Sequence, residues 1–176
     1  MDHLQAKKGV MYLTGEDFYY FTYSIILILE HLNCKNGKYF SDYRKLAFLI
    51  DFVNDRNLIS ILQSTKNRAI LNTLDKEYLF RSYSNGLTRR SEILKLIFTL
   101  EDSGYLELIR GDLESVVNIS LNTEALPSNF IDSNLFTQEY ENLKSLCQII
   151  KRLSVLTLET MIKKIYEEQG VKTWAL

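Results

Sequence analysis

Apolar residues recur at helical spacing along most of the chain. The first apolar segment follows a helix-start signal at Thr14–Gly15 and predicts a helix from Glu16 to about Leu32. Its aromatic and aliphatic residues point nearly all round the helix: Phe18, Tyr19, Phe21, Ile25, Ile26, Ile28, Leu29 and Leu32. Such a helix has to be buried on more than one side. It therefore belongs either at the centre of the core or at an interface with a partner.

Two shorter helices are predicted after a break at Asn36–Gly37. The first begins at the Ser41–Asp42 cap and closes near Asn54, with an apolar face of Leu46, Leu49, Ile50 and Val53. The second follows Asp55 and covers Leu58–Leu62.

The next stretch has the pattern of two helices joined by a turn. Apolar spacing predicts a helix over Arg68–Tyr83, and Ser84–Leu87, which contains Asn85 and Gly86, is typical of a turn. Thr88 then opens a second helix, which ends at Ser103–Gly104. Its core face consists of Ile93, Leu94, Ile97, Phe98 and Leu100.

Two strands are predicted directly after this helix. Tyr105–Arg110 alternates with period two, Gly111–Asp112 supplies a tight turn, and Val116–Leu121 is rich in β-branched residues. In the resulting hairpin we expect four residues to face inward or pair across the strands: Leu106, Leu108, Val117 and Ile119. Helix, turn, helix and hairpin together predict a winged helix. The alternative is a helix and hairpin within another α+β fold.

The remainder of the chain is predicted to be a connector and a helical tail. Residues 122–134, with the only proline, form the connector, and residues 135–176 are helical until Gly170. We therefore expect a mainly α fold with a small β-hairpin, in one domain over residues 1–176. Its parts are N-terminal helices (1–65), a winged-helix unit (66–121), the connector and the C-terminal helices.

Composition and charge indicate which kinds of partner and which compartment to expect for this protein. The 176 residues carry 21 Lys and Arg against 22 Asp and Glu, a net charge of −1, which argues against a surface devoted to nucleic acid. Cys34 and Cys147 are expected to be free thiols in a reducing compartment, with a disulfide as the alternative. Because the N-terminus lacks a signal-peptide pattern and Phe18–Leu29 is too short and polar to span a bilayer, we predict a cytoplasmic protein that does not bind membranes.

No catalytic, metal or cofactor site is predicted. The chain has two histidines, no pair of cysteines at zinc-ligand spacing, no phosphate-binding loop and no nucleophile motif. The pattern favours a protein that binds partners. An enzyme whose site forms only in space is a third, weaker hypothesis.

Two sets of residues are candidates for binding. Arg89 and Arg90, together with Lys95 and Arg110, are placed to contact phosphates from a recognition helix and its wing. The alternative is that they are ordinary surface residues, because Glu92, Glu107 and Asp112 lie among them. The candidates for partner binding are apolar: Phe18, Tyr19, Leu156, Met161 and Trp174. Trp174 either anchors a partner or folds back onto its own helices.

Two segments carry a resemblance to a known family. Residues 12–18 (YLTGEDF) lead into the apolar helix, and residues 43–53 (YRKLAFLIDFV) follow it. Together they resemble the small middle component of ABC-three-component systems, the group that includes the small subunit of Lamassu-type antiphage defence. The resemblance implies a kleisin-like adaptor without enzymatic activity. It implies as partners an SMC-like or Rad50-like ATPase and a nuclease or other effector, with DNA contacted mainly through the complex. A winged-helix transcriptional regulator is the alternative function.

Overall fold

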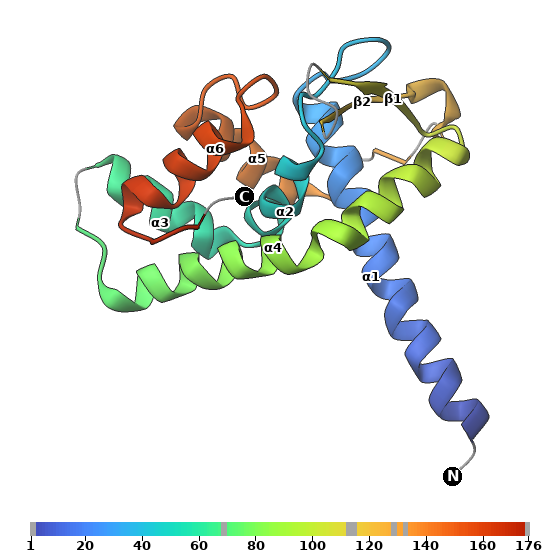
Figure 1. Cartoon of the computed structure of the whole chain (residues 1–176), viewed down its shortest axis with the longest axis horizontal. Coiled ribbons are helices and arrows are strands. Elements are labelled where there is room, and N and C mark those ends of the chain that lie inside the picture. The colour runs from blue at the N-terminus through green and yellow to red at the C-terminus, as the bar shows by residue number, and fades with distance from the viewer. Residues whose placement is uncertain (1–2, 68–69, 112–115, 128–129, 132–133, 175–176) are drawn as a thin grey trace.

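A computed structural model describes residues 3–67, 70–111, 116–127, 130–131 and 134–174, and side chains from residue 17 onwards. Its helices are α1 (His3–His31), α2 (Arg44–Asn54), α3 (Arg56–Lys66), α4 (Thr73–Asp102), α5 (Thr137–Ile149) and α6 (Leu158–Ile165). The strands are β1 (Leu106–Arg110) and β2 (Val117–Leu121), and two 3₁₀ turns cover Thr123–Ala125 and Glu167–Gln169. The fold is mainly helical with one small antiparallel hairpin, as predicted (Figure 1).

The core forms around α2. Every residue from Lys45 to Ile50 is buried, as are Phe52 and Val53. Helices α1, α4 and α5 pack against α2, and α6 contacts it as well. The predicted apolar face of α2 was therefore only part of its buried surface, because neighbours cover the helix on several sides.

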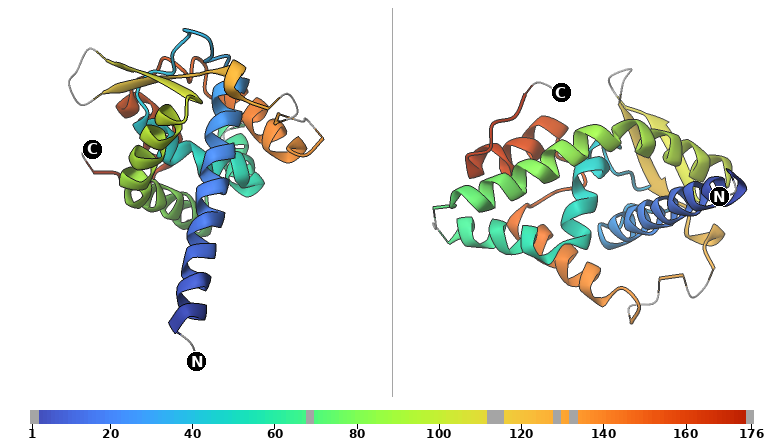
Figure 2. Two further views of the ribbon diagram at one scale, coloured as in Figure 1. Left: turned by 90° about the vertical axis from the view of Figure 1, so that its right-hand side faces the viewer. Right: turned by 90° about the horizontal axis from the view of Figure 1, so that it is seen from below.

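Helix α1 has a buried part and a projecting part. Residues Ser24–Leu29 are fully buried, whereas the N-terminal half extends away from the other elements (Figures 1 and 2). The prediction that this helix starts at Glu16 is wrong, since α1 begins at His3. A capping residue is worth only about 1 kcal/mol. The residues before Glu16 include the helix formers Leu, Gln, Ala and Lys, and they extend the helix to His3.

Helix α4 is one continuous helix of 30 residues, so the predicted helix-turn-helix is wrong. Ser84–Leu87 lies inside α4, and the Thr88 hydroxyl donates to the carbonyl of Ser84 within the helix rather than capping a new one (3.0 Å). Gly86 is buried where α4 crosses α2. A Cβ there would lie 2.2 Å from Cδ1 of Phe48. The glycine permits close helix packing and does not mark a turn.

Gly86→Ala should therefore destabilise the protein. The added methyl would displace the Phe48 ring, and overpacking of this kind costs about 2 kcal/mol, more than alanine gains in helix propensity. Urea denaturation measures the effect. The loss should shrink in a Phe48→Leu background, which removes the clashing ring. A stabilised Gly86→Ala variant would show that this close contact does not form.

The hairpin is present and is attached to the body. Leu106 pairs with Leu121, and Leu108 pairs with Ile119, which confirms the predicted inward and paired positions. Gly111 donates its N–H to the carbonyl of Val116 (2.8 Å), and Asp112 lies outside the described residues. On its other edge β2 exchanges two backbone hydrogen bonds with Phe40 through Ile119. The wing-like hairpin is thus fixed to the segment between α1 and α2.

The C-terminal segment contains two helices instead of the predicted continuous one. α5 ends at Ile149 and α6 begins at Leu158, and Arg152 between them has a positive φ of 60°. The carbonyl oxygens of this connection accept hydrogen bonds from the buried amino group of Lys45. In a continuous helix these carbonyls would accept hydrogen bonds from backbone N–H groups four residues later. Lys45 donates to them instead, so tertiary packing overrides the helical spacing of the sequence.

Candidate interaction surfaces

Arg89, the first predicted phosphate-binding residue, forms an ion pair inside the protein. Its Nη1 lies 2.6 Å from Oδ1 of Asp51 on α2, and both side chains are 14% exposed. The guanidinium also stacks 5.5 Å from the centre of the Phe21 ring on α1. Arg89 therefore joins three helices, and its charge is already neutralised.

The other predicted basic residues do not share one face. Arg90 and Lys95 both lie on α4, five positions apart, which separates them by about 140° around a helix. Arg90 is half-buried and Lys95 is exposed, while Arg110 is exposed on β1. The structure therefore does not gather the four residues into one phosphate-binding surface.

Asp51 organises a polar cluster that the sequence did not single out. Besides Arg89, its carboxylate accepts a hydrogen bond from Asn85 (3.2 Å), and a pocket of about 350 Å³ opens beside it. Burial, with the nearby Asp51 charge, raises the pKa of Tyr20 in this pocket to about 12. On the pocket wall, Tyr78 donates to Asp55 at 2.5 Å. The carboxylates here are engaged by neighbouring side chains, which makes the cluster a junction of α1, α2, α3 and α4.

The predicted partner-binding residues divide into exposed and buried ones. Phe18 and Tyr19 on α1 are 38% and 71% exposed and touch edge to face. Met161 is fully buried, so it belongs to the core and offers no surface to a partner. Leu156 is half-buried in the connection before α6, and its carbonyl accepts from Lys45.

Trp174 folds back onto α4. The Tyr83 hydroxyl donates to the carbonyl of Trp174 (3.1 Å) and lies 3.2 Å from its backbone nitrogen. The indole meets Phe80 and Tyr83 edge to face, at centroid distances of 5.9 and 6.1 Å. The residue nevertheless remains 57% exposed. The tail is docked within the molecule, with one side of the indole open.

Trp174→Ala is expected to lower the free energy of unfolding by about 1 kcal/mol, because two aromatic contacts are lost from a half-exposed site. Thermal denaturation measures this loss. Tyr83→Ala should cost more, since Tyr83 is fully buried and also contacts Phe48 and Tyr166. An unchanged melting temperature for Trp174→Ala would contradict the docking.

Sites for metals and reactive thiols were also sought. Among the described residues, no three His, Cys, Asp or Glu side chains are grouped closely enough to hold a metal. Within the same residues, none of the helices combines the length and the apolar character that crossing a membrane requires. Cys34 and Cys147 are free, as predicted, and burial raises the pKa of both thiols, that of Cys34 to about 11.

No family model, curated protein or solved structure matches this chain. The resemblance to the middle component of ABC-three-component systems therefore stays a prediction. Of the two segments that carry it, residues 43–53 form most of the central helix α2, whose apolar residues are all explained by core packing. Residues 12–18 lie in α1, in and beside its projecting part.

Proposed function

We propose that the chain is a non-enzymatic adaptor subunit of a cytoplasmic prokaryotic antiphage defence complex. In this proposal it binds an SMC-like or Rad50-like ATPase and a nuclease or other effector, and it reaches DNA mainly through those partners. The observation that supports binding most directly is the projecting half of α1, which leaves the body as a single helix (Figure 2).

Residues 3–19 of α1, here called the α1 arm, are suited to a helical partner. Phe18 and Tyr19 are exposed on this helix, and their rings touch edge to face. An exposed apolar pair on a projecting helix can pack against the surface of another helix. SMC-like and Rad50-like ATPases contain long coiled coils, so they offer a matching surface.

The alternative function has lost its main support. A winged-helix regulator would need a separate recognition helix that presents Arg89 to DNA. Helix α4 instead runs through the predicted turn, and Arg89 is paired with Asp51.

The adaptor proposal can be tested by co-purification of this chain from its host and a search of the bound proteins for a coiled-coil ATPase. Replacing Phe18 and Tyr19 together with Asp should weaken that complex about tenfold or more, because charge would enter an apolar contact. Ile109→Asp with Val155→Asp is the matched control, since these residues are 48% and 52% exposed and lie outside α1. Equal binding by the arm variant and the control, or the absence of any such ATPase complex, would refute the proposal.

A further inference from the structure

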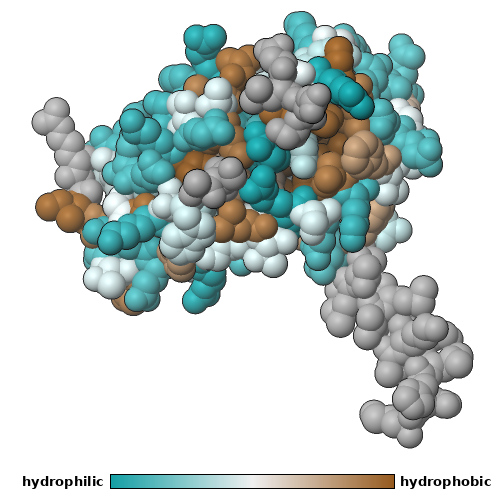
Figure 3. Space-filling view, viewed as in Figure 1, coloured by the Kyte–Doolittle hydropathy of each residue, from teal (hydrophilic) through white to brown (hydrophobic). Residues whose placement is uncertain are grey.

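A pocket opens where α3 ends, α4 begins and α5 approaches α6. It measures about 510 Å³ and has an apolar floor in which Ile149 is half-buried, whereas Leu62, Leu71 and Ile150 are buried core residues. Ile70, on its rim, is 95% exposed. Apolar surface is also visible at this end of the molecule in the space-filling view (Figure 3). Exposed apolar surface beside a hollow is typical of a binding site for another molecule.

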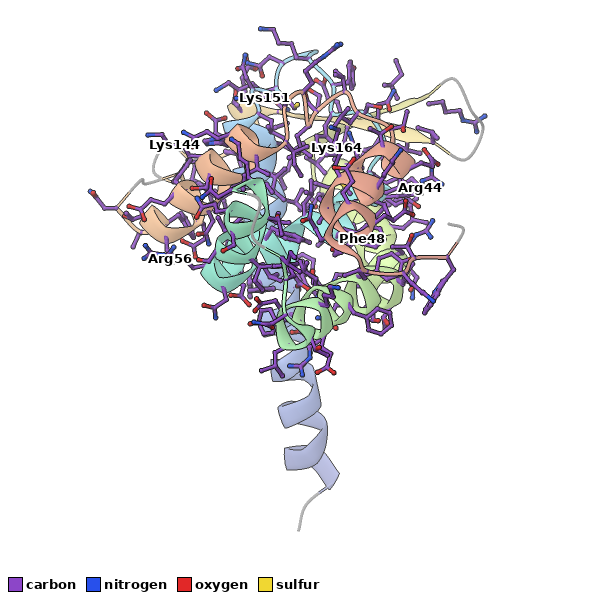
Figure 4. All side chains as sticks on the ribbon, turned by 90° about the vertical axis from the view of Figure 1, so that its left-hand side faces the viewer. Arg44, Phe48, Arg56, Lys144, Lys151 and Lys164 are labelled. Atoms are coloured by element: carbon purple, nitrogen blue, oxygen red, sulfur yellow. The ribbon has the colours of Figure 1, made fainter. Side chains whose placement is uncertain are left out.

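Three lysines surround this apolar floor. Lys66 at the end of α3, Lys76 in the first turns of α4 and Lys164 in the last turn of α6 all line the pocket. Figure 4 looks onto this end of the molecule, with Lys164 labelled. The end of the Lys76 side chain lies beside Gly170, where an added Cβ would be 3.3 Å from Nζ.

The positive charge of the pocket is largely uncompensated. Lys66 donates to the carbonyl of Gln148 (3.3 Å), and within the described part of the chain no ion pair joins any of the three lysines to a carboxylate. Glu168 is the one acidic residue in the lining, against the three lysines. The chain as a whole has a net charge of −1, so the excess of positive charge in the pocket does not reflect a generally basic surface.

We propose that this pocket docks a segment of a partner protein in which carboxylates stand beside apolar side chains. The lysines complement the carboxylates, and the exposed Ile70 with the half-buried Ile149 contacts the apolar side chains. A nucleic-acid backbone would use the lysines but leave the exposed Ile70 and the half-buried Ile149 without a matching group, so a protein segment fits the surface better. The inference extends the proposed adaptor function by giving the chain a second docking surface, separate from the α1 arm.

A synthetic peptide that alternates Leu and Glu is the probe, and the same peptide with Gln in place of Glu is its control. We expect the acidic peptide to shift backbone amide resonances around the pocket, to bind more weakly as salt is added, and to bind better than the Gln peptide. Lys76→Glu with Lys164→Glu should weaken binding about tenfold. Lys144→Glu with Lys151→Glu makes the same charge change on α5 and the residues after it, outside the lining, and should have little effect.

Several outcomes would overturn this proposal. Equal effects of the two double variants would mean that only overall charge matters. Resonance shifts elsewhere would place the peptide at another surface, and lysine-dependent binding of duplex DNA without peptide binding would make the pocket a nucleic-acid site. If the Glu variant unfolds, Lys76→Gln with Lys164→Gln makes the same test with a smaller change. The assay uses neither the α1 arm nor the ATPase, so this inference and the proposed function can fail separately.

Discussion

Replacing Lys45 with methionine is expected to lower the free energy of unfolding by about 3 kcal/mol or more. Lys45 is fully buried on α2, and its Nζ donates to the carbonyls of Leu153 (2.9 Å), Ser154 (3.1 Å) and Leu156 (2.8 Å). The ammonium also lies 4.2 Å from the centre of the Phe40 ring. Methionine fills a similar volume but donates nothing, so the carbonyls of Leu153 and Leu156 lose this donor, and that of Ser154 keeps only the backbone N–H of Ser41 (2.8 Å).

The measurement is chemical denaturation followed by circular dichroism. Lys144→Met is the matched control, because Lys144 is exposed on α5 and should change stability little. We also expect faster amide hydrogen exchange in the connection between α5 and α6 of the Lys45 variant, since that segment loses its anchor. A Lys45→Met protein as stable as the wild type would show that the three carbonyls do not depend on this lysine.

The same lysine predicts a dependence of stability on pH. Burial lowers the pKa of Lys45 from 10.5 to about 8, although the charge of Asp42 acts in the opposite direction. Between these two values the unfolded chain holds more protons than the folded one, so raising the pH favours the folded state, by at most about 1.4 kcal/mol per pH unit. Cys34, whose pKa burial raises to about 11, works against this rise above about pH 9.

The difference in unfolding free energy between wild type and Lys45→Met reports on Lys45 below about pH 9, where Cys34 keeps its proton in both proteins; above that pH the two groups are coupled, because the charge of Lys45 lowers the pKa of Cys34. That difference should grow as the pH rises from about 8 towards 10.5, and most clearly between pH 8 and 9. A difference that is constant over this range would mean that Lys45 titrates at its ordinary value when folded.

Arg89→Ala is the second substitution with a large expected effect, a loss of about 3 kcal/mol in unfolding free energy. It leaves the Asp51 carboxylate, 14% exposed, with the Asn85 amide at 3.2 Å as its remaining side-chain donor among the described residues. It also removes the contact with the Phe21 ring. An unpaired charge in a partly buried site costs more than the original pair contributes, so the loss should be much larger than for an ordinary surface arginine.

Arg90→Ala is the matched control, because it changes the neighbouring arginine and breaks no ion pair in the described part of the chain. Denaturation of both variants should show a large effect at Arg89 and a small one at Arg90. If Arg89 instead served as a phosphate contact, Arg89→Ala would keep its stability and weaken binding to duplex DNA, which a salt titration of the affinity would show.

Several features of this protein follow from local sequence signals. Asp55 separates two helices because its side chain caps the second by accepting from the N–H of Asn57 (2.8 Å). Gly104, with a φ of 80°, follows the end of α4, as predicted. The alternating residues of β1 and the β-branched residues of β2 predict a hairpin, although Arg110 pairs with Val117, across a longer connection than the predicted tight turn. These signals act over a few residues, so the sequence alone determines them.

Other features depended on tertiary structure. Gly86 has the sequence pattern of a turn, but it lies inside α4. Because it has no side chain, the Phe48 ring can pack against it, and this contact forms only when α2 and α4 come together. The break between α5 and α6 depends on the amino group of Lys45, which is more than 100 residues away in the chain. Arg89 looks available for phosphate until Asp51 lies beside it. Whether a side chain is buried, and which residue it contacts, depends on segments that are distant in the sequence. The residue types of one segment therefore cannot predict it.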